Sequence, residues 1–354
     1  MRSMVRFTEP RSAEIVEDQE VAIRPDEVLL RTLYSGISAG TELTAYRGTN
    51  PYLNRRWDND SRLFVEGEVG LTFPVDGWGY EEVGEVVEVG ADASGVAIGD
   101  RVWGTWGHRS HTVQPAARAS TRILPPDVDA RIGMFSQIGA IGLNLVLDAD
   151  IHIGETVVVF GLGVPGQIAA QFARLNGGRV IGVDHLASRR DLALKLGADV
   201  VLDPADCSVA NQVRDLTEGQ GADVCLEVSG NYAALHEAIR TVAYNSRVCV
   251  AGFMQGEGAG LRLGEEFHHN RVSLICSQIS GVSPTVQHRW DFERLCRTAI
   301  DLSIQGRLRL TELITHTFPF DQAPEAFQLL DQRPEEALQV VLSLDTDTTD
   351  EETR

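Results

Sequence analysis

The chain has 354 residues, which is long enough for two domains that each bury a core of their own. It carries 31 basic and 51 acidic side chains, for a formal charge of -20 at pH 7. A field of this sign repels nucleic acid and anionic membrane surfaces, so we expect neither as a partner. The sequence shows no long apolar run typical of a membrane helix and no signal-peptide pattern, and we expect a cytoplasmic location.

All five cysteines lie in the second half of the chain, widely spaced and mostly within apolar runs. This spacing is neither that of a disulfide framework nor that of a metal-binding cluster. We therefore expect the cysteines to behave as small buried hydrophobic side chains.

The first half of the chain indicates short β segments separated by glycines. Two are expected at 21–23 and 28–33, followed by a short helix capped by Thr41. Residues 49–70 are polar and rich in turn residues, which predicts a surface loop able to cover a site. Glycines and valines then alternate through 77–104, as is typical of a small, strongly bent β-barrel.

An apolar helical segment over 129–147 leads into residues 155–184, on which the second half is organised. Residues 157–160 are β-branched, short and ended by glycine, so they predict a buried strand. A helical pattern follows and stops at Asn176, and a second buried run ends on Asp184. This is the order of elements in a dinucleotide-binding unit.

Gly161, Gly163 and Gly166 join the first of these strands to the helix in G-x-G-x-x-G spacing. The first glycine permits a tight turn, and the second lets the backbone approach a pyrophosphate. The third lets the helix lie close to the strand, so that the helix N-terminus faces the phosphates. The agreement of strand, turn, helix and second strand predicts dinucleotide binding.

Asp184 lies where a carboxylate accepts hydrogen bonds from an adenosine ribose, which favours NAD over NADP. Arg189 and Arg190 follow closely and keep NADP open as a minority alternative. The predicted cofactor-binding residues are Gly161, Leu162, Gly163, Val164, Pro165, Gly166, Asp184, His185, Arg189, Ser229, Gly230, Gly252 and Phe253.

After Asp184 the alternation of strands and helices continues, which predicts an α/β fold with a doubly wound parallel sheet. The expected strands cover 200–202, 222–228, 247–253 and 272–276. Ser229, Gly230, Gly252 and Phe253 end successive strands, so we expect their backbone to line the nicotinamide pocket. Residues 346–354 are charged and lack a core pattern, which predicts a disordered tail.

Four local sequences together resemble the medium-chain dehydrogenase/reductase superfamily, whose best-known members are zinc alcohol and polyol dehydrogenases. They are the loop 36–48, the glycine–glutamate strand 79–86, the turn 99–102 and the cofactor turn 161–166. The resemblance implies a GroES-like β-barrel catalytic domain plus a doubly wound parallel Rossmann domain, and a homodimer or homotetramer. It places the catalytic domain at 1–127, completed by 285–345, and the Rossmann domain at 128–284.

The resemblance also exposes a departure at the metal ligands. Zinc members supply a cysteine from the first loop, a histidine from the strand motif and a cysteine or glutamate from the apolar helix. Those places hold Ser38, Tyr80 and Gln137 here, and neutral side chains bind Zn²⁺ poorly. No cysteine precedes Cys207, so the family's four-cysteine structural zinc loop is missing. We expect a member without zinc; residual metal binding through Glu81, with Glu42 or a histidine, is the minor alternative.

Without zinc, the reacting oxygen needs hydrogen bonds and a proton relay. Tyr80 is the leading acid/base candidate, because it replaces a residue that faces the nicotinamide in the family; filling the vacated space is the alternative. We expect Glu81 to orient or relay, and Thr41 either to relay or to cap a helix. Ser38 and Gln137 remain as neutral donors that would hold a polar substrate.

The remaining polar residues of interest receive structural roles. Glu42 is expected to form an ion pair. His108 and His111 follow the barrel turn, where a surface loop is expected. His268 and His269 are expected at a polar interface or loop.

These features predict an enzyme that transfers a hydride between NAD and a secondary alcohol or ketone, as in a sugar, cyclitol or other polyol. One alternative is a quinone or enoyl reductase that uses mainly NADPH. The other is a non-catalytic protein that senses a dinucleotide, since a fold alone does not establish catalysis.

Overall fold

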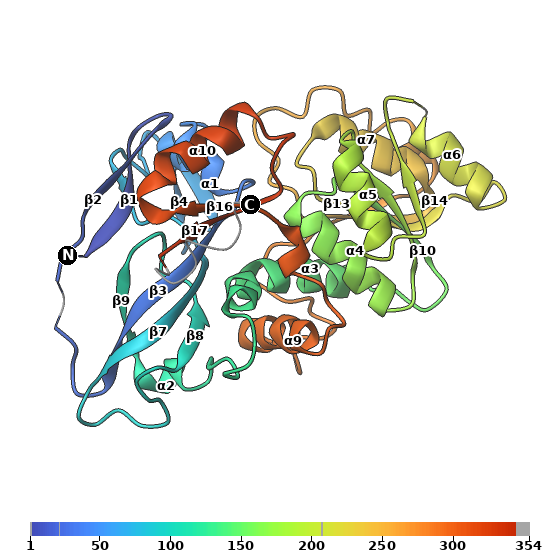
Figure 1. The fold of residues 1–354 in the computed structure, drawn as a ribbon. Helices are drawn as coiled ribbons and strands as arrows, with labels where there is room; N and C mark the ends of the chain where they lie inside the picture. Colours follow the sequence, from blue (N-terminus) through green and yellow to red (C-terminus); the bar gives the residue numbers. More distant parts are fainter. Residues whose placement is uncertain (1, 21, 207, 345–354) are drawn as a thin grey trace. The chain divides into compact units, whose positions relative to one another are not determined.

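The computed structural model describes residues 2–20, 22–206 and 208–344, which form two compact units (Figure 1). Unit 1 comprises Met1–Gln137 with Ile314–Arg354, and unit 2 comprises Ile138–Leu313. Segments 128–137 and 285–313 thus fall in the other unit from the one that the sequence analysis expected. The predicted tail, 346–354, lies outside the described residues.

Unit 2 is built on a six-stranded parallel sheet, which confirms the predicted doubly wound domain. Its order is β12-β11-β10-β13-β14-β15. The strands are β10 (Thr156–Phe160), β11 (Arg179–Val183), β12 (Val200–Leu202), β13 (Ala222–Glu227), β14 (Val242–Val250) and β15 (Ser273–Cys276). The connections change direction between β10 and β13, and open α/β sheets bind their ligands at such a switch point.

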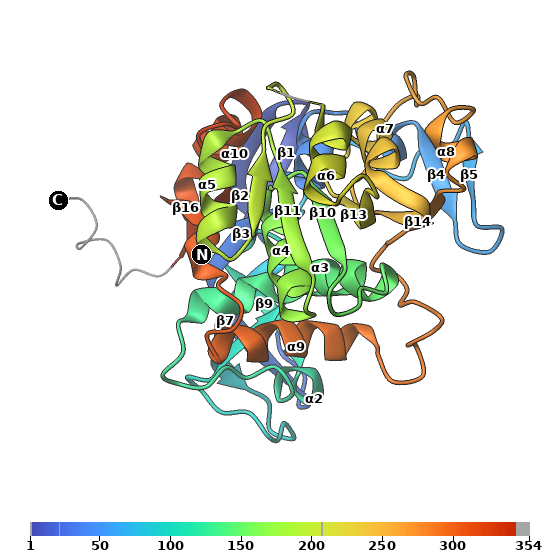
Figure 2. The same cartoon turned by 90° about the vertical axis from the view of Figure 1, so that its right-hand side faces the viewer.

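Helices cover this sheet because its central strands are apolar on both faces. All five residues of β10 are buried, and α4 packs on β10 and β11 while α7 packs on β13 and β14 (Figure 2). The helices are α3 (Ser136–Asp148), α4 (Val164–Leu175), α5 (Ala187–Lys195), α6 (Val209–Leu216), α7 (Tyr232–Thr241), α8 (Glu266–His269) and α9 (Phe292–Ile304).

The apolar helical segment predicted at 129–147 is confirmed as the 3₁₀ helix η2 (Ala130–Phe135) followed by α3. Within the described residues, Ala130–Asp148 is the one helix long and apolar enough to cross a membrane. Of the most apolar stretch of this helix, 72% is buried inside the protein, as in a core helix.

Unit 1 is rich in antiparallel strands, as expected of the catalytic domain. Its largest sheet has the order β16-β17-β3-β7-β8, with β9 also paired to β3; a three-stranded sheet β2-β1-β6 and a hairpin β4-β5 accompany it. These strands are β1 (Ser3–Glu9), β2 (Ser12–Glu17), β3 (Glu27–Ile37), β4 (Arg55–Asp58), β5 (Leu63–Glu66), β6 (Val75–Asp76), β7 (Glu81–Val89), β8 (Arg101–Gly104), β9 (His111–Pro115), β16 (Ile314–Pro319) and β17 (Gln339–Ser343).

Two predictions for this unit are wrong. The first β segment was expected at 21–23, but Ala22 and Ile23 lie outside any strand and the chain starts with the β1–β2 hairpin. Residues 49–70 lie mostly at the surface, as expected, but the prediction of a loop is wrong there, because they form the 3₁₀ helix η1 (Pro51–Leu53) and the β4–β5 hairpin. Phe64 makes aromatic contacts with both Tyr52 and Trp57, and these contacts stabilise the hairpin. In the sequence the three aromatic residues are separated by mostly polar residues, so the pattern did not indicate strands.

The cysteine prediction holds for three of the four cysteines that the structure describes. Cys225, Cys249 and Cys296 are buried, whereas Cys276 on β15 is exposed. Cys207 lies outside the described residues.

The pairing of β3 with β7 positions the polar residues of unit 1. Gly36 lies opposite Glu81, so the end of β3 runs beside the start of β7. The helix α1 (Glu42–Tyr46) begins shortly after β3 ends. Residues 38–42 are therefore brought next to Tyr80, which directly precedes β7.

Candidate active site

The glycine-rich turn of unit 2 has three glycines with different surroundings. Gly161 has φ +90°, and a Cβ there would lie 2.8 Å from the backbone of Ser229. A Cβ on Gly166 would clash with the carbonyl oxygen of Gly161. Around Gly163, which caps the N-terminus of α4, a Cβ would meet nothing within 4 Å. The outer glycines are thus needed for packing, and the middle one leaves open space at a helix N-terminus, where backbone N–H groups bind anions.

Asp184 is held in place by the backbone at the end of β11. Its Oδ2 accepts a hydrogen bond from the Leu162 N–H at 2.8 Å, and its Oδ1 accepts one from the Leu186 N–H at 2.9 Å. Each carboxylate oxygen has a second lone pair, so both remain able to accept from a ligand hydroxyl. The turn and Asp184 are thereby joined into one rigid arrangement.

The two arginines that followed Asp184 in the sequence differ in role. Arg190 donates to the carbonyl oxygen of Asp184 at 2.7 Å and forms an ion pair with Asp203 at 2.8 Å, so it supports the backbone. Arg189 lies 3.9 Å from Asp184 Oδ2. His185, also predicted to contact the cofactor, is exposed at the end of the strand.

The predicted nicotinamide-pocket residues come together at the ends of β13 and β14. A Cβ on Gly252 would clash with the backbone nitrogen of Gly230, and a Cβ on Gly230 would lie 3.2 Å from the Phe253 carbonyl oxygen. Gly230 has φ +69°, a conformation that glycine adopts without strain. These residues therefore lie together at one edge of the sheet, and their lining of a nicotinamide pocket stays a prediction.

Sequence reasoning missed Glu227, the last residue of β13. Its side chain is fully buried, and its Oε1 accepts hydrogen bonds from the Ser229 N–H, at 2.9 Å, and from the Ser229 hydroxyl. Its Oε2 has no hydrogen-bond partner among the described residues, and burial raises the pKa of this carboxyl. The signal was present: a carboxylate at the end of an otherwise apolar strand.

In unit 1, three hydroxyl groups converge. The phenol oxygen of Tyr80 hydrogen-bonds the Ser38 hydroxyl and lies 3.5 Å from Thr41 Oγ1. Burial raises the pKa of Tyr80 above its usual value, so the phenol is neutral at pH 7. Thr41 occupies the N-cap position of α1, but its side chain makes no capping hydrogen bond. The predicted residues Tyr80, Ser38 and Thr41 thus form one group, called the hydroxyl cluster below.

Glu81 lies next to this cluster in sequence but does not bond to it. Its side chain is 1% exposed, and neither carboxylate oxygen has a hydrogen-bond partner among the described residues. Burial, with Glu42 and Glu82 nearby, raises the pKa of Glu81 well above its usual value. A Cβ on Gly36 would lie 2.5 Å from its Oε2, so the carboxyl is packed against backbone. Among the described residues, no hydrogen bond joins the Glu81 carboxyl to Tyr80, so its expected role of orienting Tyr80 is not supported by a direct contact.

The expectation that His108 lies in a surface loop is wrong. The ring is fully buried against Phe327 of the helix α10 (Ala323–Gln332), with ring centroids 5.7 Å apart. His108 Nε2 lies 2.6 Å from Glu42 Oε2, and its Nδ1 lies 2.7 Å from the Ser35 hydroxyl. Burial lowers the pKa of His108, but the carboxylates of Glu42 and Glu82 together raise it by more, so the net shift is upward. Glu42 therefore forms the predicted ion pair, with this histidine.

A second buried carboxyl, Glu82, completes this group. Its Oε2 accepts a hydrogen bond from the Trp106 N–H at 2.6 Å, and its Oε1 accepts one from the Ser35 hydroxyl at 3.3 Å. Burial raises the pKa of Glu82 to about 7, although His108 opposes the shift. Glu42 Oε1 accepts a hydrogen bond from the Ser38 N–H at 3.0 Å. This bond links the Glu42–His108 pair to the hydroxyl cluster.

The remaining predicted residues lie outside these groups. Gln137 is half-buried in the first turn of α3 and makes no hydrogen bond to the hydroxyl cluster within the described chain. His111 is half-buried on β9, and His268 and His269 are exposed on α8. The only described histidine, cysteine and carboxylate side chains grouped tightly enough to hold a metal ion are His236, Glu265 and Glu266, in unit 2.

Comparison with known proteins places the chain in a family. The family model for zinc-binding dehydrogenases matches residues 164–293. Over 341 residues the chain is 32% identical to a D-guloside 3-dehydrogenase of Escherichia coli (strain K12), covering 94% of this chain and 97% of that protein.

Two solved structures show the same fold. A protein of Sinorhizobium meliloti 1021, solved with NADP bound, is 21% identical, with a TM-score of 0.74 over 97% of this chain and 99% of its own. An alcohol dehydrogenase of Escherichia coli CFT073, in complex with NADH, is 19% identical, with a TM-score of 0.75 over the same shares.

Family membership decides between the functional alternatives. A quinone or enoyl reductase and a non-catalytic sensor were both open on the sequence, whereas the matching family model is that of zinc-binding dehydrogenases and the relative from Escherichia coli is a D-guloside 3-dehydrogenase. The chain belongs to the zinc-type medium-chain dehydrogenase superfamily, and it is a dehydrogenase that acts on a CH–OH group with a nicotinamide dinucleotide.

Proposed function

We propose that the protein is a zinc-independent, NAD(H)-dependent dehydrogenase that oxidises a secondary hydroxyl of a sugar, cyclitol or other polyol, or reduces the matching ketone. The observation that carries this proposal is the hydroxyl cluster. Tyr80 and Ser38 stand where the family resemblance places metal ligands, and their oxygens are hydrogen-bonded to each other.

The donor set supports the zinc-independent part. Zn²⁺ is bound by thiolates, imidazoles and carboxylates, whereas the hydroxyl cluster offers neutral oxygens, and the raised pKa of Tyr80 keeps its phenol protonated. Glu81 adds one buried carboxyl whose pKa is also raised. Glu42 and His108 are already bonded to each other. These residues therefore do not fit a zinc ion.

In the proposed reaction, the bound nicotinamide accepts or gives the hydride. Tyr80 holds the proton at its phenol oxygen, donating it to a carbonyl oxygen during reduction and taking it from the alcohol during oxidation. Because the phenol is neutral, its own proton must leave as a new one arrives. Ser38 and Thr41, which lie against the phenol oxygen, would relay that proton along hydroxyl groups to water at the half-buried Thr41.

The preference for NAD rests on Asp184. Two backbone N–H groups orient its carboxylate, which would accept from the ribose hydroxyls and repel a 2′-phosphate. Arg189 is a nearby cation whose charge would favour NADP, and it lies 3.9 Å from the same carboxylate. The Asp184 carboxylate therefore partly offsets the positive charge of Arg189, which would otherwise attract a 2′-phosphate.

The substrate class rests on similarity and on the polarity of the cluster. The relative from Escherichia coli acts on a D-guloside at position 3, which is a ring hydroxyl of a sugar. Hydroxyl groups such as those of Ser38 and Thr41 both donate and accept, which suits a substrate with several hydroxyls.

The test is a substrate screen with chelator-treated enzyme, both cofactors, and glycosides, cyclitols, polyols and their keto forms. We expect turnover with NAD on a glycoside or polyol, unchanged by chelator and not increased by added Zn²⁺. Turnover that disappears with chelator and returns with Zn²⁺ would overturn zinc independence. Turnover restricted to simple alcohols would overturn the substrate class.

A further inference from the structure

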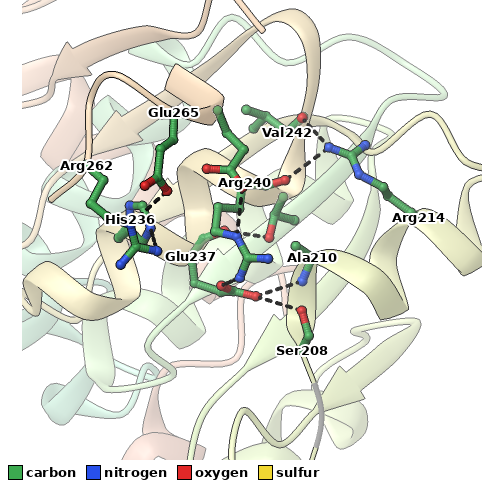
Figure 3. A network of polar contacts seen from close by, with 11 residues as sticks. Ser208, Ala210, Arg214, His236, Glu237, Arg240, Val242, Arg262 and Glu265 are labelled. Atoms are coloured by element: carbon green, nitrogen blue, oxygen red, sulfur yellow. Dashed lines mark hydrogen bonds and ion pairs between the residues drawn. The ribbon is translucent and has the colours of Figure 1, made fainter. Parts of the chain in front are cut away.

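The cluster His236, Glu265 and Glu266 in unit 2 is not used by the proposed reaction. His236 lies on α7, Glu266 begins α8, and Glu265 directly precedes that helix. Figure 3 shows His236 and Glu265 together with Arg262. One ligand atom from each residue lies within 4.8 Å of the other two. A ring nitrogen and two carboxylate oxygens thus converge from two packed helices.

Two buried polar atoms of this cluster have no partner among the described residues. The His236 side chain is nine-tenths buried, at 9% exposed, and its Nδ1 makes no hydrogen bond. Oε2 of Glu266 is also enclosed and unbonded, while its Oε1 is held by Arg240 at 3.2 Å. Enclosed polar atoms without partners are uncommon in folded proteins, and the Glu266 oxygen points to a ligand that completes it. His236 Nδ1 carries the ring proton when Nε2 accepts a hydrogen bond, so Nε2 is the ring nitrogen that remains for a ligand.

The guanidinium group of Arg262 is a cation that is already hydrogen-bonded to the cluster. Arg262 donates to His236 Nε2 at 2.9 Å and to Glu265 Oε2 at 2.7 Å, as Figure 3 shows. Because Arg262 is always charged, the ring nitrogen that accepts its hydrogen bond is unprotonated. The Arg262 side chain is 57% exposed, so it is free to turn into solvent. Its departure would leave a ring nitrogen and carboxylates facing one another.

We propose that His236, Glu265 and Glu266 bind a divalent transition-metal ion, with Zn²⁺ as the type, and that Arg262 is the resident cation that the ion displaces. One imidazole and two carboxylates, with water as the fourth ligand, form a donor set that suits tetrahedral zinc. Arg240 would continue to orient Glu266 by donating a hydrogen bond to Glu266 Oε1, as supporting side chains do around bound metals. The ion would join α7 to the segment before α8.

Displacement predicts that loss of a ligand and loss of Arg262 have opposite effects on metal affinity, which a plain surface cluster does not predict. The experiment is calorimetric titration of the chelator-treated full chain with Zn²⁺. We expect one site, weakened roughly tenfold or more by His236→Gln and by Glu265→Gln, because each removes a ligand. Arg262→Ala should instead tighten binding roughly tenfold, because the competing cation is gone.

Arg297→Ala serves as the matched control, since it removes an exposed arginine that pairs with Glu293 on α9. We expect it to bind Zn²⁺ like the original chain. The inference is overturned if Arg262→Ala fails to tighten binding, or if His236→Gln and Glu265→Gln both bind Zn²⁺ unchanged. Circular dichroism separates misfolding from ligand loss, and Glu265→Gln changes an exposed residue. The readout is metal affinity, so the result does not depend on turnover.

Discussion

The phenol oxygen of Tyr80 is hydrogen-bonded to the hydroxyl of Ser38, although 42 positions separate the two residues in the chain. The antiparallel pairing of β3 with β7 creates this contact, because Gly36 and Glu81 are register partners and the two hydroxyl residues flank that pair. Thr41 joins them from the start of α1 at 3.5 Å. The contact brings three hydroxyl groups that are scattered in the sequence together, as the proposed proton path requires.

Tyr80→Phe tests this path. Removal of the phenol oxygen should lower kcat by about 10²–10⁴, the usual contribution of a positioned acid or base, and leave the affinity for NADH unchanged. Steady-state kinetics and NADH fluorescence titration measure the two effects. Tyr52→Phe removes a phenol oxygen outside the hydroxyl cluster and should keep full turnover. An unchanged kcat in Tyr80→Phe would mean that the ring only fills space.

Asp184→Asn tests the choice of cofactor. The substitution removes a charge that repels a 2′-phosphate but keeps a side-chain oxygen for the backbone N–H groups of Leu162 or Leu186. We expect the ratio of kcat/KM for NADPH to that for NADH to rise roughly tenfold, the effect of one charged hydrogen bond. Asp191→Asn, on the exposed side of α5, should leave the ratio unchanged. A constant ratio in both variants would remove Asp184 as the discriminating residue.

The glycine-rich turn allows a comparison of two alanine substitutions. Gly166→Ala should lower the thermal midpoint by several degrees, because the new Cβ clashes with the Gly161 carbonyl oxygen. Gly163→Ala should leave the midpoint unchanged, because its Cβ enters open space, yet weaken NADH binding roughly tenfold by filling the space for the pyrophosphate. Thermal unfolding with and without NADH separates the two. Equal effects of both would contradict the assignment of the open space to the dinucleotide.

Glu82→Gln should change how stability depends on pH. The folded pKa of Glu82, about 7, lies above the value of 4.5 for a free carboxyl, so the native state binds this proton more tightly. That contribution is complete below about pH 4.5 and is lost as pH rises through 7, at a cost of about 3 kcal/mol. The glutamine keeps an oxygen for the Trp106 N–H and has no proton to lose.

Urea unfolding followed by tryptophan fluorescence at pH 5 and pH 8.5 measures this difference. We expect the free energy of unfolding of the original chain to fall, relative to that of Glu82→Gln, as the pH increases. Glu85→Gln, which alters a half-exposed carboxyl on the same strand, should follow the original chain. Parallel curves for Glu82→Gln and the original chain would show that the buried carboxyl is not the titrating group.

Much of unit 2 was predictable because its signals are local. The buried run at 156–160, the glycine turn and Asp184 follow one another within a single βα unit, and each residue type has one conformational reason to be there. The hydroxyl cluster was predictable only through a family resemblance. Nothing in the spacing of Ser38, Thr41 and Tyr80 brings them together without the register of β3 and β7.

The polar residues that sequence reasoning misplaced are those whose surroundings come from distant segments. His108 was expected at the surface because it follows a turn, yet it is covered by Phe327, from the far end of the chain. Glu227 was missed because it is one charge in an apolar strand. Its surroundings come from the turn at Ser229, which donates a hydrogen bond to it, and from Gly252, which packs against its carboxyl from the next strand. Burial is a property of the assembled core, and a local pattern does not contain it.

The sequence by itself determined the dinucleotide turn and the parallel sheet, and with them the nicotinamide chemistry. Strand periodicity and the conformational freedom of glycine act over a few residues, so they can be read in order along the chain. The tertiary structure alone decided that Glu42 pairs with His108. The two residues are 66 positions apart in the chain and come into contact only when unit 1 folds. The tertiary structure likewise left Glu81 buried beside Tyr80 with no hydrogen-bond partner for its carboxylate within the described part of the chain, since packing rather than sequence order sets which polar groups lose contact with water.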